Sequence, residues 1–120
     1  MHEATCHCGN ISIIISNLPT SVTSCNCSLC NRLGTLWGYY SPKEVKVSTA
    51  KEPTATYICG DKYIEFHHCP LCGCTTHYTS TDKCEEKRTA INCRMFSLEL
   101  MQSIPVRKFD EANTWQYIDK

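Results

Sequence analysis

The stretch Cys69-Pro70-Leu71-Cys72-Gly73-Cys74 is the most specific signal in this sequence. Two cysteines separated by two residues and followed by glycine are typical of a zinc knuckle, a tight turn that presents two thiolates to one ion. Glycine after the second cysteine permits a left-handed backbone. A second such turn, Cys6-His7-Cys8-Gly9, lies near the N-terminus. The two turns predict one closed site that ties the start of the chain to its middle, with the ligands Cys6, Cys8, Cys69 and Cys72.

A third cluster, Cys25-Asn26-Cys27-Ser28-Leu29-Cys30, offers three thiolates from one short loop and has no obvious fourth ligand nearby. Three protein ligands and an open position are typical of a reactive zinc site. Zinc with three thiolates carries a net charge near −1, so the site favours a soft ligand such as a small thiol over activated water. The alternative is a closed, unreactive site completed by Cys74, another cysteine or a histidine.

Composition favours metal over disulfides. The chain has 11 cysteines in 120 residues, an odd number in closely spaced groups, and its N-terminus lacks the basic and apolar regions of a signal peptide. We therefore expect a cytoplasmic zinc protein, and the alternatives are a secreted disulfide scaffold or plain buried thiols. The 12 basic and 12 acidic residues balance, so no nucleic-acid partner is expected. The apolar stretches are too short to cross a membrane.

Short β-branched and aromatic segments separated by turn residues predict a mainly β fold in a single zinc-binding domain over residues 1–120. No long stretch shows a helical period, but a helical turn is expected at Ser28 to Leu33, ended by Gly34. The loop Asp82 to Lys87 is charged and expected to be exposed. The expected strands include Asn10–Ser16, Leu36–Tyr40, Thr54–Cys59, Lys62–His68 and Thr89–Met95.

These motifs resemble the glutathione-dependent formaldehyde-activating enzyme family, also called the centromere protein V family. The resemblance covers nearly the whole chain and rests on the three cysteine clusters, with Asn31-Arg32 and Gly34, Ile91-Asn92-Cys93-Arg94, and the tail Phe109-Asp110-Glu111-Ala112-Asn113-Thr114-Trp115. The chain departs from the family pattern at two places. At His67-His68 the family often has phenylalanine and cysteine, and at Cys74 it usually has a small or hydroxylated residue.

The resemblance implies a zinc-stapled β fold of the type shared with Rab-binding zinc proteins and methionine sulfoxide reductase B. It implies two zinc ions. One is structural, at Cys6, Cys8, Cys69 and Cys72, and one is of the catalytic type, at Cys25, Cys27 and Cys30. Members of the family are described as carbon–sulfur lyases that join glutathione and formaldehyde into S-hydroxymethylglutathione.

Three polar residues near these motifs are candidates for binding the ligand. Arg32 could offset the negative cluster or hold a carboxylate of glutathione, or it could be a solvated arginine. Asn92 and Arg94 would share one side of a strand, where they could line a pocket, or they could cap a turn and pair on the surface.

The leading hypothesis is a zinc-dependent carbon–sulfur lyase-type enzyme that acts on a glutathione adduct, with Cys25, Cys27 and Cys30 as its catalytic centre. The alternative is a non-catalytic zinc module that binds a protein partner. An open coordination position at the Cys25 cluster separates the two, because the enzyme needs it and the module does not.

Overall fold

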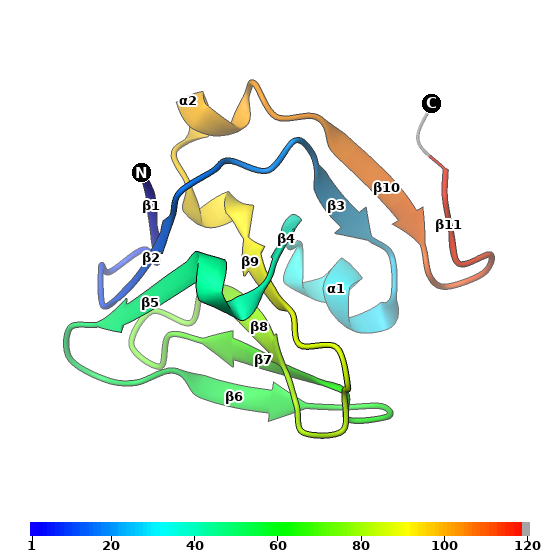
Figure 1. Cartoon of the computed structure of the whole chain (residues 1–120), viewed down its shortest axis with the longest axis horizontal. Coiled ribbons are helices and arrows are strands. Elements are labelled where there is room, and N and C mark those ends of the chain that lie inside the picture. Colours follow the sequence, from blue (N-terminus) through cyan, green and yellow to red (C-terminus); the bar gives the residue numbers. More distant parts are fainter. Residues whose placement is uncertain (119–120) are drawn as a thin grey trace.

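Two β-sheets form the framework of the computed structural model, which describes residues 1–118 (Figure 1). The smaller sheet has the order β1-β2-β5 and is antiparallel throughout. Its strands are β1 (His2–Thr5), β2 (Ile11–Ile15) and β5 (Val45–Thr49). The mainly β character expected from the sequence is confirmed.

The larger sheet has the order β11-β10-β3-β4-β9-β8-β7-β6. All neighbours in it are antiparallel except β3 and β10, which run parallel, so the C-terminal hairpin lies beside the strand that leads into the Cys25 cluster. The bounds of its strands are β3 (Val22–Cys25), β4 (Trp37–Tyr40), β6 (Ala55–Ile58), β7 (Ile64–His68), β8 (Thr75–Ser80), β9 (Thr89–Asn92), β10 (Val106–Asp110) and β11 (Gln116–Tyr117).

The helices are short. α1 (Ser28–Leu33) follows the Cys25 loop, and Gly34 ends it with a left-handed φ of 68°, which confirms the predicted helical turn. The others are η1 (Pro42–Glu44), η2 (Cys93–Met95) and α2 (Leu98–Met101). No helix among residues 1–118 is long and apolar enough to span a membrane.

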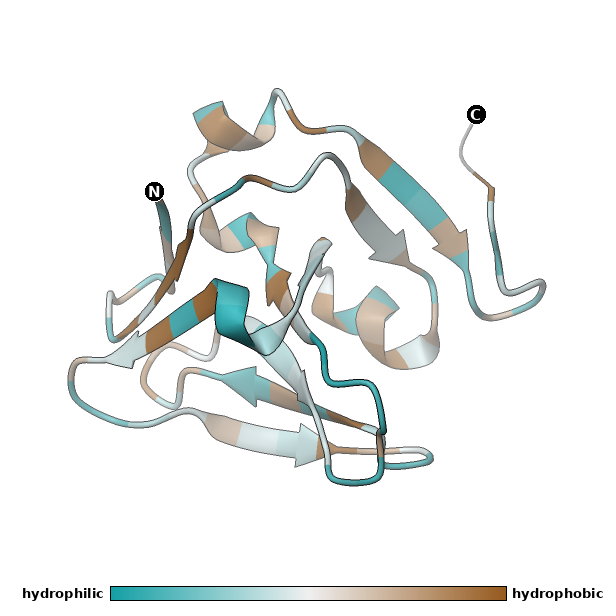
Figure 2. Cartoon of the chain, viewed as in Figure 1, coloured by the Kyte–Doolittle hydropathy of each residue, from teal (hydrophilic) through white to brown (hydrophobic). Residues whose placement is uncertain are grey.

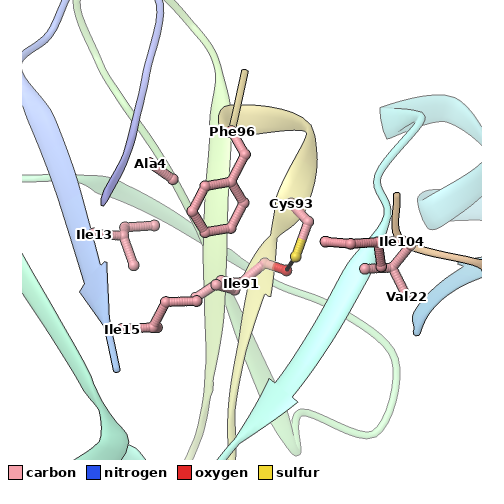
Figure 3. Packing of buried hydrophobic residues seen from close by; sticks show 8 residues of the cluster. All are labelled: Ala4, Ile13, Ile15, Val22, Ile91, Cys93, Phe96 and Ile104. Atoms are coloured by element: carbon pink, nitrogen blue, oxygen red, sulfur yellow. Dashed lines mark hydrogen bonds between the residues drawn. The ribbon is translucent and has the colours of Figure 1, made fainter. Parts of the chain in front are cut away.

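The main core lies between the two sheets, and β2 contributes to it from alternating positions. In β2, Ile11, Ile13 and Ile15 are buried while the residues between them are half-buried. Figure 3 shows Ile13 and Ile15 facing Ile91 of β9, and the hydropathy colouring of Figure 2 marks β2 as apolar. Eight buried residues share this cluster: Ala4, Ile13, Ile15, Val22, Ile91, Cys93, Phe96 and Ile104.

The strand predicted over Thr89–Met95 is wrong beyond Asn92, where the chain turns into η2. The Asn92 side chain accepts the backbone N–H of Arg94 at 3.2 Å and caps this turn. Asn92 and Arg94 therefore do not share one side of a strand. β3 was not expected either, because Val22-Thr23-Ser24-Cys25 carries one clearly apolar residue.

A substitution at Gly38 of β4 would measure how tightly the main core is packed. A Cβ atom there would lie 2.9 Å from the Cys93 sulfur, so we expect Gly38→Ala to cost about 1–3 kcal/mol of unfolding free energy through overpacking. Adding Cys93→Ala removes the clashing atom. We therefore expect the double variant to be at least 1 kcal/mol more stable than the sum of the single effects predicts, as measured by urea unfolding. Additive effects would show that the two residues do not compete for space.

Candidate metal centres

The first cluster contains the four cysteines that the sequence analysis predicts as ligands of one site, two from each of two distant turns. The sulfurs of Cys6, Cys8, Cys69 and Cys72 all lie within 4.8 Å of one another. The Cys8 sulfur is 3.7 Å from the sulfurs of both Cys6 and Cys69. Sulfurs at about 2.3 Å from a tetrahedral ion are separated by about 3.8 Å, so this arrangement fits a four-coordinate metal such as zinc.

Both turns of this cluster depend on glycine in a left-handed conformation. Gly9 and Gly73 each have a φ of 82°. The Gly9 N–H donates to the Cys6 carbonyl at 3.1 Å, and the Gly73 N–H donates to the Cys69 carbonyl at 2.8 Å. The two loops have the same local structure, and each directs a pair of thiols to the same point.

Backbone and side-chain N–H groups surround the sulfurs of the first cluster. The Ile11 N–H donates to the Cys6 sulfur at 3.2 Å, and Cys69 accepts from the Leu71 N–H and from Asn10 Nδ2, both at 3.4 Å. Burial raises the pKa of the Cys72 thiol, but hydrogen bonding from backbone amides, chiefly those of Cys74 and Cys8, outweighs it and lowers the pKa to about 5. At Cys69 and Cys72 these contacts outweigh burial, lower the pKa and favour the thiolate, which is the form that binds metal. At Cys8 the hydrogen bond from the Asn10 backbone is outweighed by burial and by the neighbouring thiols, which raise the pKa to about 11.

The second cluster is assembled at the start of α1. The sulfurs of Cys25, Cys27 and Cys30 lie within 4.8 Å of one another. Cys27 is the N-cap of the helix, and its sulfur accepts the Cys30 N–H at 3.3 Å. The Cys25 sulfur accepts the Cys27 N–H at 3.5 Å, and the Cys30 sulfur accepts Nε1–H of the buried Trp37 at 3.4 Å. A helix N-terminus thus directs the three thiols to one point.

This cluster opens onto a cleft of about 580 Å³. Cys30 is buried, whereas Cys25 and Cys27 are half-buried. Eight aromatic side chains line the cleft, namely Trp37, Tyr39, Tyr63, Phe66, Tyr78, Phe109, Trp115 and Tyr117. Trp37 is both buried and part of the cleft wall.

Among residues 1–118, no fourth cysteine, histidine or carboxylate atom lies within 4.8 Å of all three of these sulfurs. Cys74, which the sequence left open as a fourth ligand, packs against Cys6, Ile11 and Cys69 instead. His67 is held by Thr54 at 2.8 Å and by Thr79 at 2.9 Å, through its two ring nitrogens. The described part of the chain therefore supplies three ligands at this site.

The C-terminal turn covers one side of the Cys25 cluster. Asn26 Nδ2 donates to Asp110 Oδ1 at 2.7 Å, and Asn26 Oδ1 accepts the Ala112 N–H at 3.0 Å. This clamp brings Glu111 into the cleft, 3.8 Å from the Cys25 sulfur. Sequence reasoning did not single out Glu111, because its proximity depends on the pairing of β10 with β3.

The three predicted ligand-binding residues do not line this cleft. Arg32 is exposed and donates to the Ser28 carbonyl at 2.8 Å within α1. Asn92 is buried and donates to the Thr75 carbonyl at 2.8 Å, and Arg94 donates through Nε to the Gly34 carbonyl. All three support the loops around α1, and a direct role in binding stays a prediction.

Arg88, which the sequence did not point to, is the cation that lines the cleft. Its guanidinium lies 4.5 Å from the Tyr39 ring centre and 5.9 Å from that of Tyr78. Two acidic residues, Asp61 and Glu111, line the same cleft. Arg88 follows the charged loop that was expected to be exposed, so no local signal distinguished it from its solvated neighbours.

We expect Cys72→Ser to lose about one equivalent of metal and to lower Tm by roughly 10 °C or more, because its cluster joins segments distant in sequence. Cys74→Ser is the matched control, since Cys74 neighbours the cluster without belonging to it. Metal analysis and thermal melts with and without chelator measure both effects. An unchanged melt of Cys72→Ser would remove the structural role from this cluster.

We expect Cys27→Ser to lose the metal of the second cluster and to keep the fold, because its three thiols come from one loop. Cys27→Ala should lose the same metal and also about 1 kcal/mol of unfolding free energy, since Ala cannot cap α1 and Ser can. Metal content and chemical unfolding of both variants give the comparison. Loss of both metals in Cys27→Ser would show that the two clusters are not independent.

Comparison with known proteins gives a fold and no family. No protein-family model matches this sequence. No curated protein matches it significantly either. The crystal structure of a Rhodobacter sphaeroides protein, a structural genomics target, superimposes on this chain with a TM-score of 0.70 at 22% sequence identity. The match covers 88% of this chain and 99% of that one, so the two proteins share their fold over almost the whole of that chain.

Proposed function

We propose that this chain is a zinc-dependent carbon–sulfur lyase-type enzyme that acts on a glutathione adduct such as S-hydroxymethylglutathione. The observation that supports the proposal is the opening of the three-cysteine cluster onto an aromatic cleft. A purely structural site would be closed by a fourth ligand, whereas a reactive site keeps a position for its substrate. The family resemblance of the cysteine motifs supplies the reaction, and the cleft supplies room for a tripeptide.

The same proposal assigns a structural zinc to Cys6, Cys8, Cys69 and Cys72, within the zinc-stapled fold that the resemblance implies. Zinc at the second cluster would supply a soft, open position that holds a thiol as thiolate. The Cys25, Cys27 and Cys30 thiolates set the charge of that position near −1, which disfavours water activation. Nε1–H of Trp37 delocalises part of the negative charge on Cys30.

The reaction balances with the thiol and formaldehyde alone. The thiol loses its proton, the sulfur–carbon bond forms, and the carbonyl electron pair moves to oxygen, which takes up one proton. Cleavage of S-hydroxymethylglutathione is the exact reverse. The aromatic wall of the cleft holds the reactants together and keeps bulk water away, so the contribution of this chain is orientation of the carbonyl carbon against the sulfur.

We expect metal-loaded protein to bind glutathione through its sulfur and to release nearly one proton near pH 7, because a free thiol has a pKa of about 8.5. Calorimetry in buffers of different ionisation enthalpy measures the proton, and S-methylglutathione is the comparison ligand because it cannot form a thiolate. Equal binding of the two ligands would show that the sulfur is not on the metal.

Cys27→Ser provides the control, because losing the metal should abolish the preference for glutathione over its S-methyl form. If the unmodified protein binds neither ligand, the glutathione hypothesis fails. The non-catalytic module that binds a protein partner is then the better account.

A further inference from the structure

We infer that Arg88 binds a carboxylate of the substrate, so that the cleft selects thiols that carry a carboxylate away from the sulfur. The inference rests on the proposed function, because it takes the sulfur to be held at the Cys25 cluster. It makes Arg88 the residue that sets both the class of thiol and its direction in the cleft.

The first argument is the electrostatic environment. Two carboxylates line the cleft, Glu111 beside the Cys25 sulfur and Asp61, and zinc bound by the three cysteines as thiolates would add a net charge near −1 at the metal end. A carboxylate of the ligand is repelled from these groups. Arg88 is the cation among the residues that line the cleft, so it is the position where an anionic group is attracted.

The second argument is that the Arg88 guanidinium is held in position while no carboxylate among the described residues pairs with it. It rests over the rings of Tyr39 and Tyr78, and within residues 1–118 it has no carboxylate partner. Its backbone is fixed at the start of β9, where the Arg88 N–H donates to Ser80 Oγ at 2.8 Å and the Ser80 N–H donates to the Arg88 carbonyl at 3.1 Å. A positioned guanidinium with unused N–H donors matches the two oxygens of a carboxylate.

The third argument is reach. Trp37 touches the Cys30 sulfur through Nε1 at 3.4 Å, and its ring centre lies 4.8 Å from that of Tyr78, over which Arg88 lies. Two aromatic side chains thus separate the metal end from the guanidinium, so the carboxylate must lie many bonds from the sulfur, as it does in a tripeptide such as glutathione. Arg88 also lines a second hollow of about 760 Å³, so a longer ligand can continue past it.

The experiment compares glutathione with its diethyl ester on the metal-loaded protein by calorimetry. The two thiols have the same peptide length, but the ester has no free carboxylate. We expect Arg88→Gln to weaken glutathione about tenfold and to leave the diethyl ester unchanged, because a charge-assisted hydrogen bond is lost only with the acid. Arg88→Lys should recover part of the loss, since it restores the charge without the paired donors.

Lys46→Gln is the control for net charge, because Lys46 is exposed on β5 of the smaller sheet and does not line the cleft. It should leave both affinities unchanged. If Arg88→Gln weakens both thiols equally, or neither, the carboxylate role of Arg88 is wrong while the proposed function stands. If the unmodified protein binds both thiols no better than their S-methyl forms, the proposed function fails and this inference fails with it.

Discussion

The convergence of four thiols from two glycine turns is the constraint on which the rest of the fold depends. Cys8 and Cys69 are 61 residues apart in sequence, yet their sulfurs are in contact. One turn precedes β2 of the smaller sheet, and the other connects β7 and β8 of the larger one. The two sheets are thus fastened together at one edge of the main core. A chain of this size has a modest core, so a metal bound at this point would add stability where the two layers meet.

The second cluster depends on the fold in a different way. Its three cysteines come from one loop, whereas the residues that line the cleft around them come from segments distant in sequence. The cleft wall comes from β4, β7, β8 and the C-terminal hairpin, and the clamp of Asn26 on Asp110 and Ala112 joins the last of these to the cysteine loop. The side chains that would select a ligand are therefore encoded far from the cysteine motif. Proteins with the same three cysteines can differ in substrate through these outer segments alone.

Spacing within one turn was enough to predict both cysteine clusters, because C-x-C, C-x-x-C and the glycine that follows them are local rules. The helical turn ended by Gly34 and the β-branched strand β2 followed from equally local signals. The residues that surround the Cys25 cluster could not be predicted from such local signals. Arg88 and Glu111 reach the cleft through strand pairings between distant segments, and the reading of Thr89–Met95 as one strand failed because the Asn92 side chain competes with the ladder for the next backbone N–H.

The parallel pairing of β3 with β10 also affects the order in which the molecule assembles. Asn26 and Asp110 are separated by 84 residues, so the wall that they hold together closes one of the longest loops in the chain. Closing so long a loop is entropically costly and is expected late in folding. During synthesis, this wall cannot form until the residues up to Asp110 have left the ribosome. The three thiols of the Cys25 loop are therefore open to solvent in the nascent chain, and a metal ion would reach them before the cleft around them exists.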